Sequence, residues 1–283
     1  MKDRSPVLVS RNNPKIKQIR SLRQRKGRDE TGLFIVEGIR HIGEAVESGL
    51  QIDSLCYAPD LLSSAYALEL LSQQQARGTT CLALETATFT SLADKENPQG
   101  ILAVVRKPAW ALTQLSPGNF PWGVALVAPQ DPGNIGTILR TIDAVGASGL
   151  LLLENSADPY HPSAVRASMG SLFWVPVIQA SIADFLRWSK GNSYTLYGTS
   201  AHDSRDYRLA GQVHFPLILL LGSEREGLSI EQRQACDQLL RLPMHGRATS
   251  LNLAVAAGVM LYAIENSLAG WEYQSKGRRS AGK

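Results

Sequence analysis

The stretch LILLLGSEREGLS, residues 217–229, decides the fold class of this 283-residue chain. Its first five residues are all aliphatic, which is typical of a strand buried within a sheet. The run breaks at Gly222 into a segment with two glycines and two carboxylates, and ligands of open α/β sheets bind at this carboxyl edge of the strands. Ser229 can cap a helix that follows. Taken alone, the stretch fits an ordinary strand–turn–helix joint better than a ligand site.

Apolar strands alternate with helical segments on both sides of this stretch, from residue 122 to residue 268. Such alternation predicts an α/β domain built on a parallel sheet. The predicted strands are 123–128, 150–154, 175–179, 194–199, 217–222 and 240–242. The predicted helices are 135–146, 163–169, 182–190, 230–237 and 251–268.

A shorter alternation in residues 33–106 predicts a second, smaller α/β domain with a mostly parallel sheet. Before it, Asn13-Pro14 is typical of a helix start, and the helix expected there is basic. Residues 107–121 contain three prolines and no clear periodicity, so they are interpreted as a linker. The predicted organisation is a first domain in residues 1–106, this linker, a second domain in residues 122–268 and a basic tail in residues 269–283.

The composition excludes several classes of protein. Hydrophobic residues make up 44% of the chain and charged residues 19%, as in ordinary globular proteins. No apolar run approaches the roughly 18 residues of a membrane-spanning helix, and the N-terminus lacks the apolar core of a signal peptide, so we expect a cytoplasmic protein. The histidines and cysteines form no metal-binding spacing, and P-loop, G-x-G-x-x-G and serine-hydrolase motifs do not occur. We therefore expect no metal.

Positive charge is concentrated at the two ends of the chain. The first 30 residues hold ten Lys or Arg against three Asp or Glu, and residues 276–283 add four cations and no acid. Because the whole chain carries a net charge of only +4, the region between these ends is acidic. Basic ends favour a polyanionic partner such as nucleic acid. The alternative is a solvated helix face and a tail that binds nothing.

Two further segments contain residues that could bind a ligand or pack closely against another segment. In PQDPGNIGTILR, residues 129–140, Asn134 is predicted to cap a helix on which Arg140 lies about 9 Å further along. Arg140 follows aliphatic residues, which predicts an anionic partner, although a surface arginine fits as well. In LPMHGRATSLNLAVAAG, residues 242–258, small helical residues predict close packing against another backbone.

In this order and at these spacings, the three segments resemble the signature motifs of the SpoU (TrmH-type) branch of the SPOUT methyltransferases, over roughly Val124 to Leu268. The N-terminal part resembles the substrate-binding domain of this family through NPKIK (13–17), FIVEG (34–38) and QGILA (99–103). Members of the family transfer a methyl group from S-adenosylmethionine to a ribose 2′-hydroxyl of structured RNA, and they act as homodimers. The resemblance thus implies a parallel-sheet α/β domain whose C-terminal stretch threads a trefoil knot around the cofactor.

The resemblance also implies roles for individual residues. Arg140 would clamp the phosphate beside the target ribose and stabilise the developing alkoxide, with proton removal assisted by this arginine or by a phosphate oxygen. Asn134, Ser250 and Asn252 would orient the hydroxyl and the arginine. Glu226 would fix the knot loops, or the arginine across the dimer interface. The implied cofactor-binding residues are Thr199, Leu221, Gly222, Glu224, Gly227, Leu242, Pro243, Met244 and Leu251.

The N-terminal domain would then bind the RNA. Family members with such a domain act mainly on ribosomal RNA, which favours ribosomal over transfer RNA. Few aromatic residues accompany the basic helix, so recognition of folded RNA by shape is expected rather than stacking on unpaired bases. The residues expected to contact phosphates are Lys15, Lys17, Arg20, Arg23, Arg25, Lys26 and Arg28.

Three alternatives stay open at this point: ribose methylation of transfer RNA, base methylation as in other SPOUT branches, and RNA binding without catalysis. The pairing of Asn134 with Arg140 favours a ribose acceptor. The intact motifs argue against a loss of catalysis.

Overall fold

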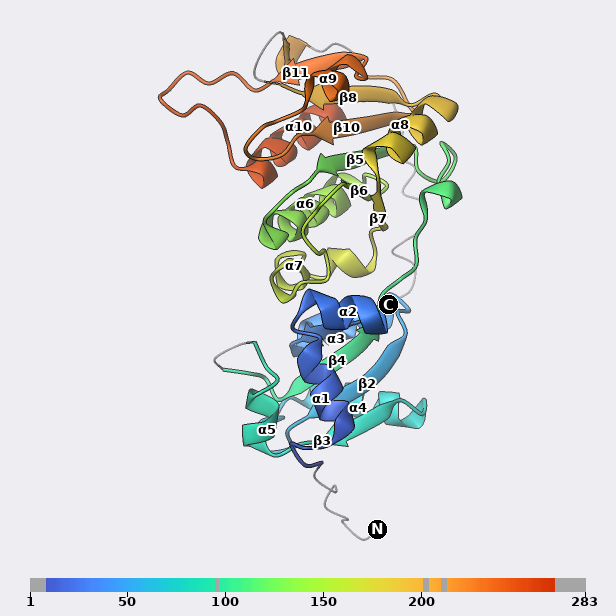
Figure 1. The fold of residues 1–283 in the computed structure, drawn as a ribbon. Helices are drawn as coiled ribbons and strands as arrows, with labels where there is room; N and C mark the ends of the chain where they lie inside the picture. The colour runs from blue at the N-terminus through green and yellow to red at the C-terminus, as the bar shows by residue number, and fades with distance from the viewer. Residues whose placement is uncertain (1–8, 95–96, 201–203, 210–212, 268–283) are drawn as a thin grey trace.

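The computed structural model describes residues 9–94, 97–200, 204–209 and 213–267. The chain folds into two α/β domains stacked one above the other, and the segment between them runs along one side (Figure 1). The predicted basic tail, residues 269–283, lies outside the described residues. Within those residues, no helix is both long enough and apolar enough to cross a membrane.

The C-terminal domain is built on a seven-stranded sheet with the order β7-β6-β5-β10-β8-β11-β9. Every neighbouring pair of strands is parallel, as the alternation predicts. The strands are β5 (Trp122–Val127), β6 (Leu150–Leu153), β7 (Val177–Ala180), β8 (Thr195–Thr199), β9 (Arg205–Asp206), β10 (Leu217–Leu221) and β11 (Gln238–Arg241). The helices are α6 (Pro132–Val145), α7 (Pro162–Ala167), α8 (Ile182–Gly191), α9 (Ile230–Gln234) and α10 (Leu253–Ser267), with short 3₁₀ helices at Ser171–Phe173 and Tyr207–Leu209.

Alternate residues of the central strands face two separate helical layers. On β5, Val124 and Leu126 belong to one apolar cluster with α6 and α10, whereas Ala125 and Val127 belong to another with α8. The strand β10 is buried at every residue for the same reason. Since helices cover both faces of the sheet, polar groups that must reach a ligand can do so only at the strand ends.

The N-terminal domain contains a four-stranded sheet with the order β1-β4-β2-β3. Its strands are β1 (Leu33–Glu37), β2 (Ile52–Tyr57), β3 (Thr80–Ala83) and β4 (Ile101–Arg106), and its helices are α1 (Pro14–Ser21), α2 (Arg25–Thr31), α3 (Ile39–Glu47), α4 (Ala65–Ala76) and α5 (Thr86–Thr90). Of the three neighbouring pairs only β2–β3 is parallel, because β4 runs antiparallel to both β1 and β2, so the prediction of a mostly parallel sheet is wrong. The strand β4 lies between β1 and β2 in the interior of the sheet.

The basic N-terminal segment forms two helices, α1 and α2, instead of one. Asn13 caps α1 as predicted, because its Oδ1 accepts a hydrogen bond from the Lys15 N–H at 2.8 Å. The turn between the helices is tight, since a Cβ at Gly27 would lie 2.3 Å from the carbonyl oxygen of Ser21. The two helices therefore pack as one unit. The segment that follows β4 contains only the 3₁₀ helix η1 (Leu112–Gln114).

Candidate active site

The parallel sheet brings the three singled-out segments to one edge. The strands β5, β10, β8 and β11 are neighbours, and the segments after β5, β10 and β11 begin at their carboxyl ends. From β5 the chain first adds β6 and β7 on one side, and the later strands lie on the other side. The boundary between β5 and β10 is therefore the topological switch point, where sheets of this kind bind their ligands.

A set of hydrogen-bonded side chains, here called the polar network, crosses this switch point. Asn134 Nδ2 donates to Glu224 Oε1 at 3.2 Å, and Asn252 Nδ2 donates to Asn134 Oδ1 at 3.0 Å. Asn252 Oδ1 accepts from the backbone N–H groups of Ala254 and Val255 at the start of α10. Because N–H groups can only donate, they fix the orientation of the Asn252 amide and, through it, that of the Asn134 amide.

Glu224 also holds the loop that follows β5. The backbone N–H of Gln130 donates to Glu224 Oε2 at 3.3 Å, and Gln130 Nε2 donates to the carbonyls of Ala128 and Asn155 at 2.8 and 3.3 Å. Ala128 has a φ of 47°, a left-handed conformation that is rare for a residue with a Cβ. Strained backbone of this kind is concentrated at functional sites. We call residues 128–131 the active-site loop.

Asn134 is not the N-cap of its helix, so that prediction is wrong. Asp131 caps α6, with its Oδ1 accepting from the Gly133 N–H at 2.8 Å, because Pro132 suits the first helical position. Asn134 lies in the first turn with 9% of its surface exposed. Its amide is thereby free to join the polar network.

The structure separates the two carboxylates of the motif after β10. Both side chains are exposed, but the Glu224 carboxylate joins the polar network, whereas Glu226 uses only its backbone N–H, which donates to Ser223 Oγ. A bridge between Ser223 and Gly227 folds this segment into a tight turn, and a Cβ at Gly222 would lie 2.1 Å from the backbone of Gly227. No pattern in the sequence distinguishes the two carboxylates, because the turn that does so is a tertiary feature.

Arg140 and Ser250 are exposed. Among the described residues nothing forms a hydrogen bond or an ion pair with the Arg140 guanidinium, so its side chain is available to an anion from outside the chain.

The carboxyl edge also presents apolar side chains suited to a flat organic ligand. Met244 and Leu251 are 36% and 40% exposed, although such side chains are normally buried. Thr199 and Leu242 lie partly buried at neighbouring strand ends. Burial raises the pKa of the Cys236 thiol to about 12, so it stays protonated and is no nucleophile at neutral pH. The described residues contain no group of side chains that could hold a metal ion.

The basic residues of α1 and α2 differ in their surroundings. Lys17 and Lys26 are exposed, and Lys15 forms an ion pair with Asp53 at 2.7 Å. Arg28 is only 1% exposed and is paired within the protein, so its assignment to an RNA-binding surface is wrong. No local signal marks Arg28, because its partner lies 130 residues away. Arg20 donates to Ser91 Oγ, Arg23 to the Ala93 carbonyl and Arg25 to the Ser156 carbonyl.

A parallel α/β sheet with a polar network at its switch point defines a ligand-binding domain of the doubly wound class. Comparison with known proteins specifies it further. Residues 121–262 match the SpoU rRNA Methylase family, and residues 13–103 match the MRM3-like substrate binding domain. The chain belongs to the SpoU rRNA methylase family.

Relatives resemble the chain along most of its length. A 23S rRNA (uridine(2479)-2′-O)-methyltransferase from Streptomyces viridochromogenes is 35% identical over 95% of this chain and 96% of its own. The 23S rRNA (guanosine(2553)-2′-O)-methyltransferase RlmP of Bacillus subtilis (strain 168) is 30% identical over 90% and 97%. The crystal structure of an AdoMet-bound rRNA methyltransferase from Sinorhizobium meliloti superimposes with a TM-score of 0.85 at 35% identity, covering 93% of this chain and 98% of that one.

The polar network predicts that Glu224 matters more than Glu226 for methyl transfer. Replacing Glu224 by Ala leaves the Asn134 amide without its acceptor and is expected to lower kcat/KM about tenfold or more. The matched variant Glu226→Ala should lose less. Steady-state kinetics with radiolabelled methyl donor measures both, and an equal or larger loss in Glu226→Ala would contradict the role given to Glu224.

Proposed function

We propose that this protein transfers the methyl group of S-adenosylmethionine to a ribose 2′-hydroxyl of 23S-type ribosomal RNA, in the cytoplasm. The polar network at the switch point, in a chain of the SpoU family, carries the proposal. The two named relatives modify nucleotides that carry different bases, uridine and guanosine, and both names specify the 2′-oxygen of the ribose. A ribose acceptor is therefore favoured over base chemistry. Neither relative is named for transfer RNA, which favours ribosomal RNA.

The residues at the carboxyl edge fit the proposed cofactor. Exposed Met244 and Leu251 offer apolar walls for adenine, and the backbone around Gly222 and Leu242, with Thr199, offers polar partners for adenine and ribose. Leu221, Glu224, Gly227 and Pro243 line the same strand ends and are proposed to complete the site. When bound, S-adenosylmethionine supplies a methyl group on a positively charged sulfur. The trefoil knot around this site stays a prediction.

Arg140 is proposed to act on the RNA side of the reaction. Its free guanidinium can bind the phosphate beside the target ribose and stabilise the charge that develops on the 2′-oxygen. A guanidinium keeps its proton far above neutral pH, so Arg140 assists proton removal by stabilising the developing alkoxide, and a phosphate oxygen can accept the proton. Asn134 and Asn252, held in fixed orientations by the network, and the exposed Ser250 are proposed to orient the hydroxyl.

We assign RNA binding to residues 1–106, methyl transfer to residues 122–268 and a linker to residues 107–121. The family matches to residues 13–103 and 121–262 support this division. The exposed cations of α1 and α2 can neutralise phosphates, which adds affinity that does not depend on sequence.

We also propose that two copies of the chain associate through α10. Val255, Val259 and Tyr262 recur at helical spacing, and they are 52%, 37% and 50% exposed. A stripe of large apolar side chains on one helix face favours a protein partner. The small residues of α10 predict that another backbone packs closely against this helix. At Gly258 none of the described residues does so, because a Cβ there would meet no atom within 4 Å. A second copy would supply this backbone.

Replacing Arg140 by Ala is expected to abolish methyl transfer and to leave RNA affinity within a few fold, because the other cations still bind phosphates. Transfer of labelled methyl groups to ribosomal RNA from cells lacking the protein measures the first quantity, and filter binding measures the second. Activity equal to wild type would remove Arg140 from the mechanism.

The double substitution Lys17→Gln/Lys26→Gln is expected to weaken RNA binding and to flatten the plot of log affinity against log salt by roughly one unit per lysine. Lys190→Gln, an exposed lysine on α8, is the matched control and should leave the slope unchanged. An unaltered slope in the double variant would show that these two lysines face solvent and do not contact RNA phosphates.

The double substitution Val255→Arg/Val259→Arg is expected to convert a dimer into a monomer, because two buried charges would oppose association. Sedimentation velocity gives the mass. Leu68→Arg, at a side chain 49% exposed on α4, is the control and should remain dimeric. A monomeric wild type, or a dimeric double variant, would contradict the assignment of α10.

A further inference from the structure

A buried ion pair joins the RNA-binding helices to the C-terminal domain. Arg28 Nε donates to Asp158 Oδ2 at 2.6 Å, and the two side chains are 1% and 7% exposed. Arg28 Nη1 also donates to the carbonyls of Leu22 and Arg23, at 2.7 and 2.9 Å. Asp158 Oδ1 accepts from the backbone N–H of Tyr160 at 2.9 Å. Both charges are thus satisfied in a single arrangement.

The segment that contains Asp158 is bonded in turn to the active-site loop. We call residues 154–158 the clamp loop. The Ala157 N–H donates to the Pro129 carbonyl at 2.7 Å, and Gln130 Nε2 donates to the Asn155 carbonyl at 3.3 Å. On its other side, Arg25 Nη1 donates to the Ser156 carbonyl at 3.1 Å. The clamp loop is therefore held between α2 and the active-site loop.

Gln130 continues this path into the polar network. Its backbone N–H donates to Glu224, which accepts from Asn134 through its other carboxylate oxygen. Hydrogen bonds, joined by the backbone between Ala157 and Asp158 and between Pro129 and Gln130, thus connect Arg28 to the Asn134 amide. An apolar contact could hold the two domains together, but it would not fix their relative position as tightly as directional bonds between buried charges.

We propose that Arg28 and Asp158 are positioning residues, which hold the active-site loop and Asn134 in a fixed place relative to α1 and α2. RNA phosphates bound by exposed cations of those helices then lie at a set distance from the polar network. The inference rests on the proposed function for its consequence in catalysis, but the physical link from Asp158 to the active-site loop can be tested without any reaction.

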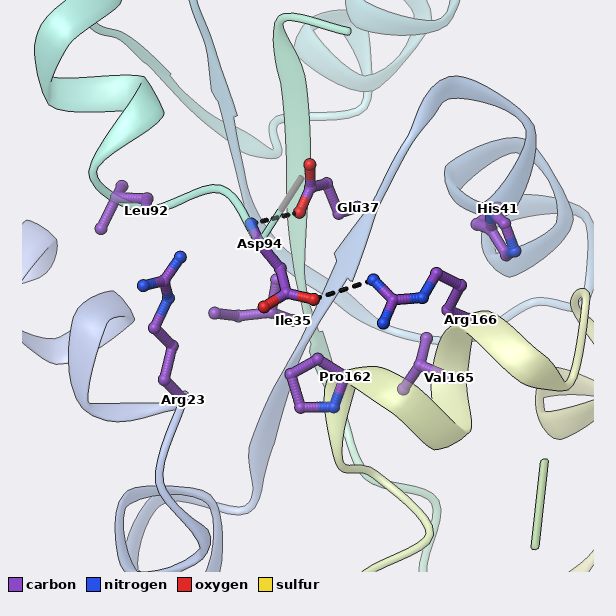
Figure 2. Close-up of a pocket in the computed structure, with 9 residues that line it drawn as sticks. All are labelled: Arg23, Ile35, Glu37, His41, Leu92, Asp94, Pro162, Val165 and Arg166. Carbon is purple, nitrogen blue, oxygen red and sulfur yellow. Dashed lines mark hydrogen bonds and ion pairs between the residues drawn. The ribbon is translucent and has the colours of Figure 1, made fainter. Parts of the chain in front are cut away.

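Two other contacts between the domains provide controls. Arg166 Nη1 lies 2.9 Å from Asp94 Oδ2, and both side chains are about half exposed at the small pocket between the domains (Figure 2). Trp174 Nε1 donates to Glu44 Oε2 at 3.2 Å. In the described part of the chain, none of these four side chains forms a hydrogen bond to residues 128–131 or 154–158.

Hydrogen–deuterium exchange of the full chain tests the link. In Asp158→Asn, amide exchange is expected to rise about fivefold or more both in residues 153–158 and in residues 129–135, because each segment loses its support. Trp174→Phe and Asp94→Asn remove a contact between the domains elsewhere and should change neither segment. Faster exchange confined to residues 153–158 would overturn the proposal. If circular dichroism shows that Asp158→Asn does not fold, Arg28→Lys takes its place. It keeps the positive charge but loses the set of bonds that Arg28 makes through Nε and Nη1, and the same exchange criterion applies to it.

Kinetics tests the consequence for catalysis. With ribosomal RNA from cells lacking the protein, at saturating RNA and methyl donor, Asp158→Asn is expected to lower kcat about fivefold or more while the RNA dissociation constant stays within about twofold. Combining it with Gln130→Ala should lower kcat no further than the more severe single substitution, since both break one path. Multiplicative losses would overturn the proposal. A wild type that methylates no RNA would refute the proposed function instead, and the exchange result would stand on its own.

Discussion

The hydrogen bonds of the Asn134 amide hold the candidate active site together. Its nitrogen donates to Glu224 and its oxygen accepts from Asn252, so one buried side chain ties together the segments that follow β5, β10 and β11. Leaving a buried amide without one of its hydrogen-bond partners lowers the free energy of unfolding by about 1–3 kcal/mol. The loss of Glu224 or of Asn252 would therefore also disturb Asn134. The network is consequently a rigid reference point beside which a ribose and a methyl donor can be aligned.

The parallel sheet explains why this reference point lies where it does. Helices cover both faces of β5 and β10, so polar groups cannot reach a ligand through the layers of the domain. Polar groups can therefore reach a ligand only at the carboxyl ends of these strands. There the tight turn at Gly222 brings Glu224 to the first turn of α6. The clamp loop connects this edge of the sheet to the helix α2 of the other domain through hydrogen bonds.

The sequence predicts elements better than it predicts their partners. The strand Leu33–Glu37 and the parallel sheet of the C-terminal domain follow from apolar runs and their alternation, and the structure confirms them. The antiparallel direction of β4 was missed because periodicity specifies a strand but not the way it runs. The burial of Arg28 and the bond from Asn134 to Glu224 leave no sequence signal for a related reason, since each depends on a contact between residues distant in the chain.

Ribose methylation can be read from ribosomal RNA by mapping alkali-resistant linkages, because a 2′-O-methyl group removes the nucleophile that cleaves the backbone. RNA would be compared from cells that contain the protein, cells that lack it, and cells that carry Asn134→Ala. We expect a resistant linkage in 23S-type RNA that is present only with the unaltered protein. Identical cleavage patterns in all three samples, or a methyl group found on a base, would contradict it.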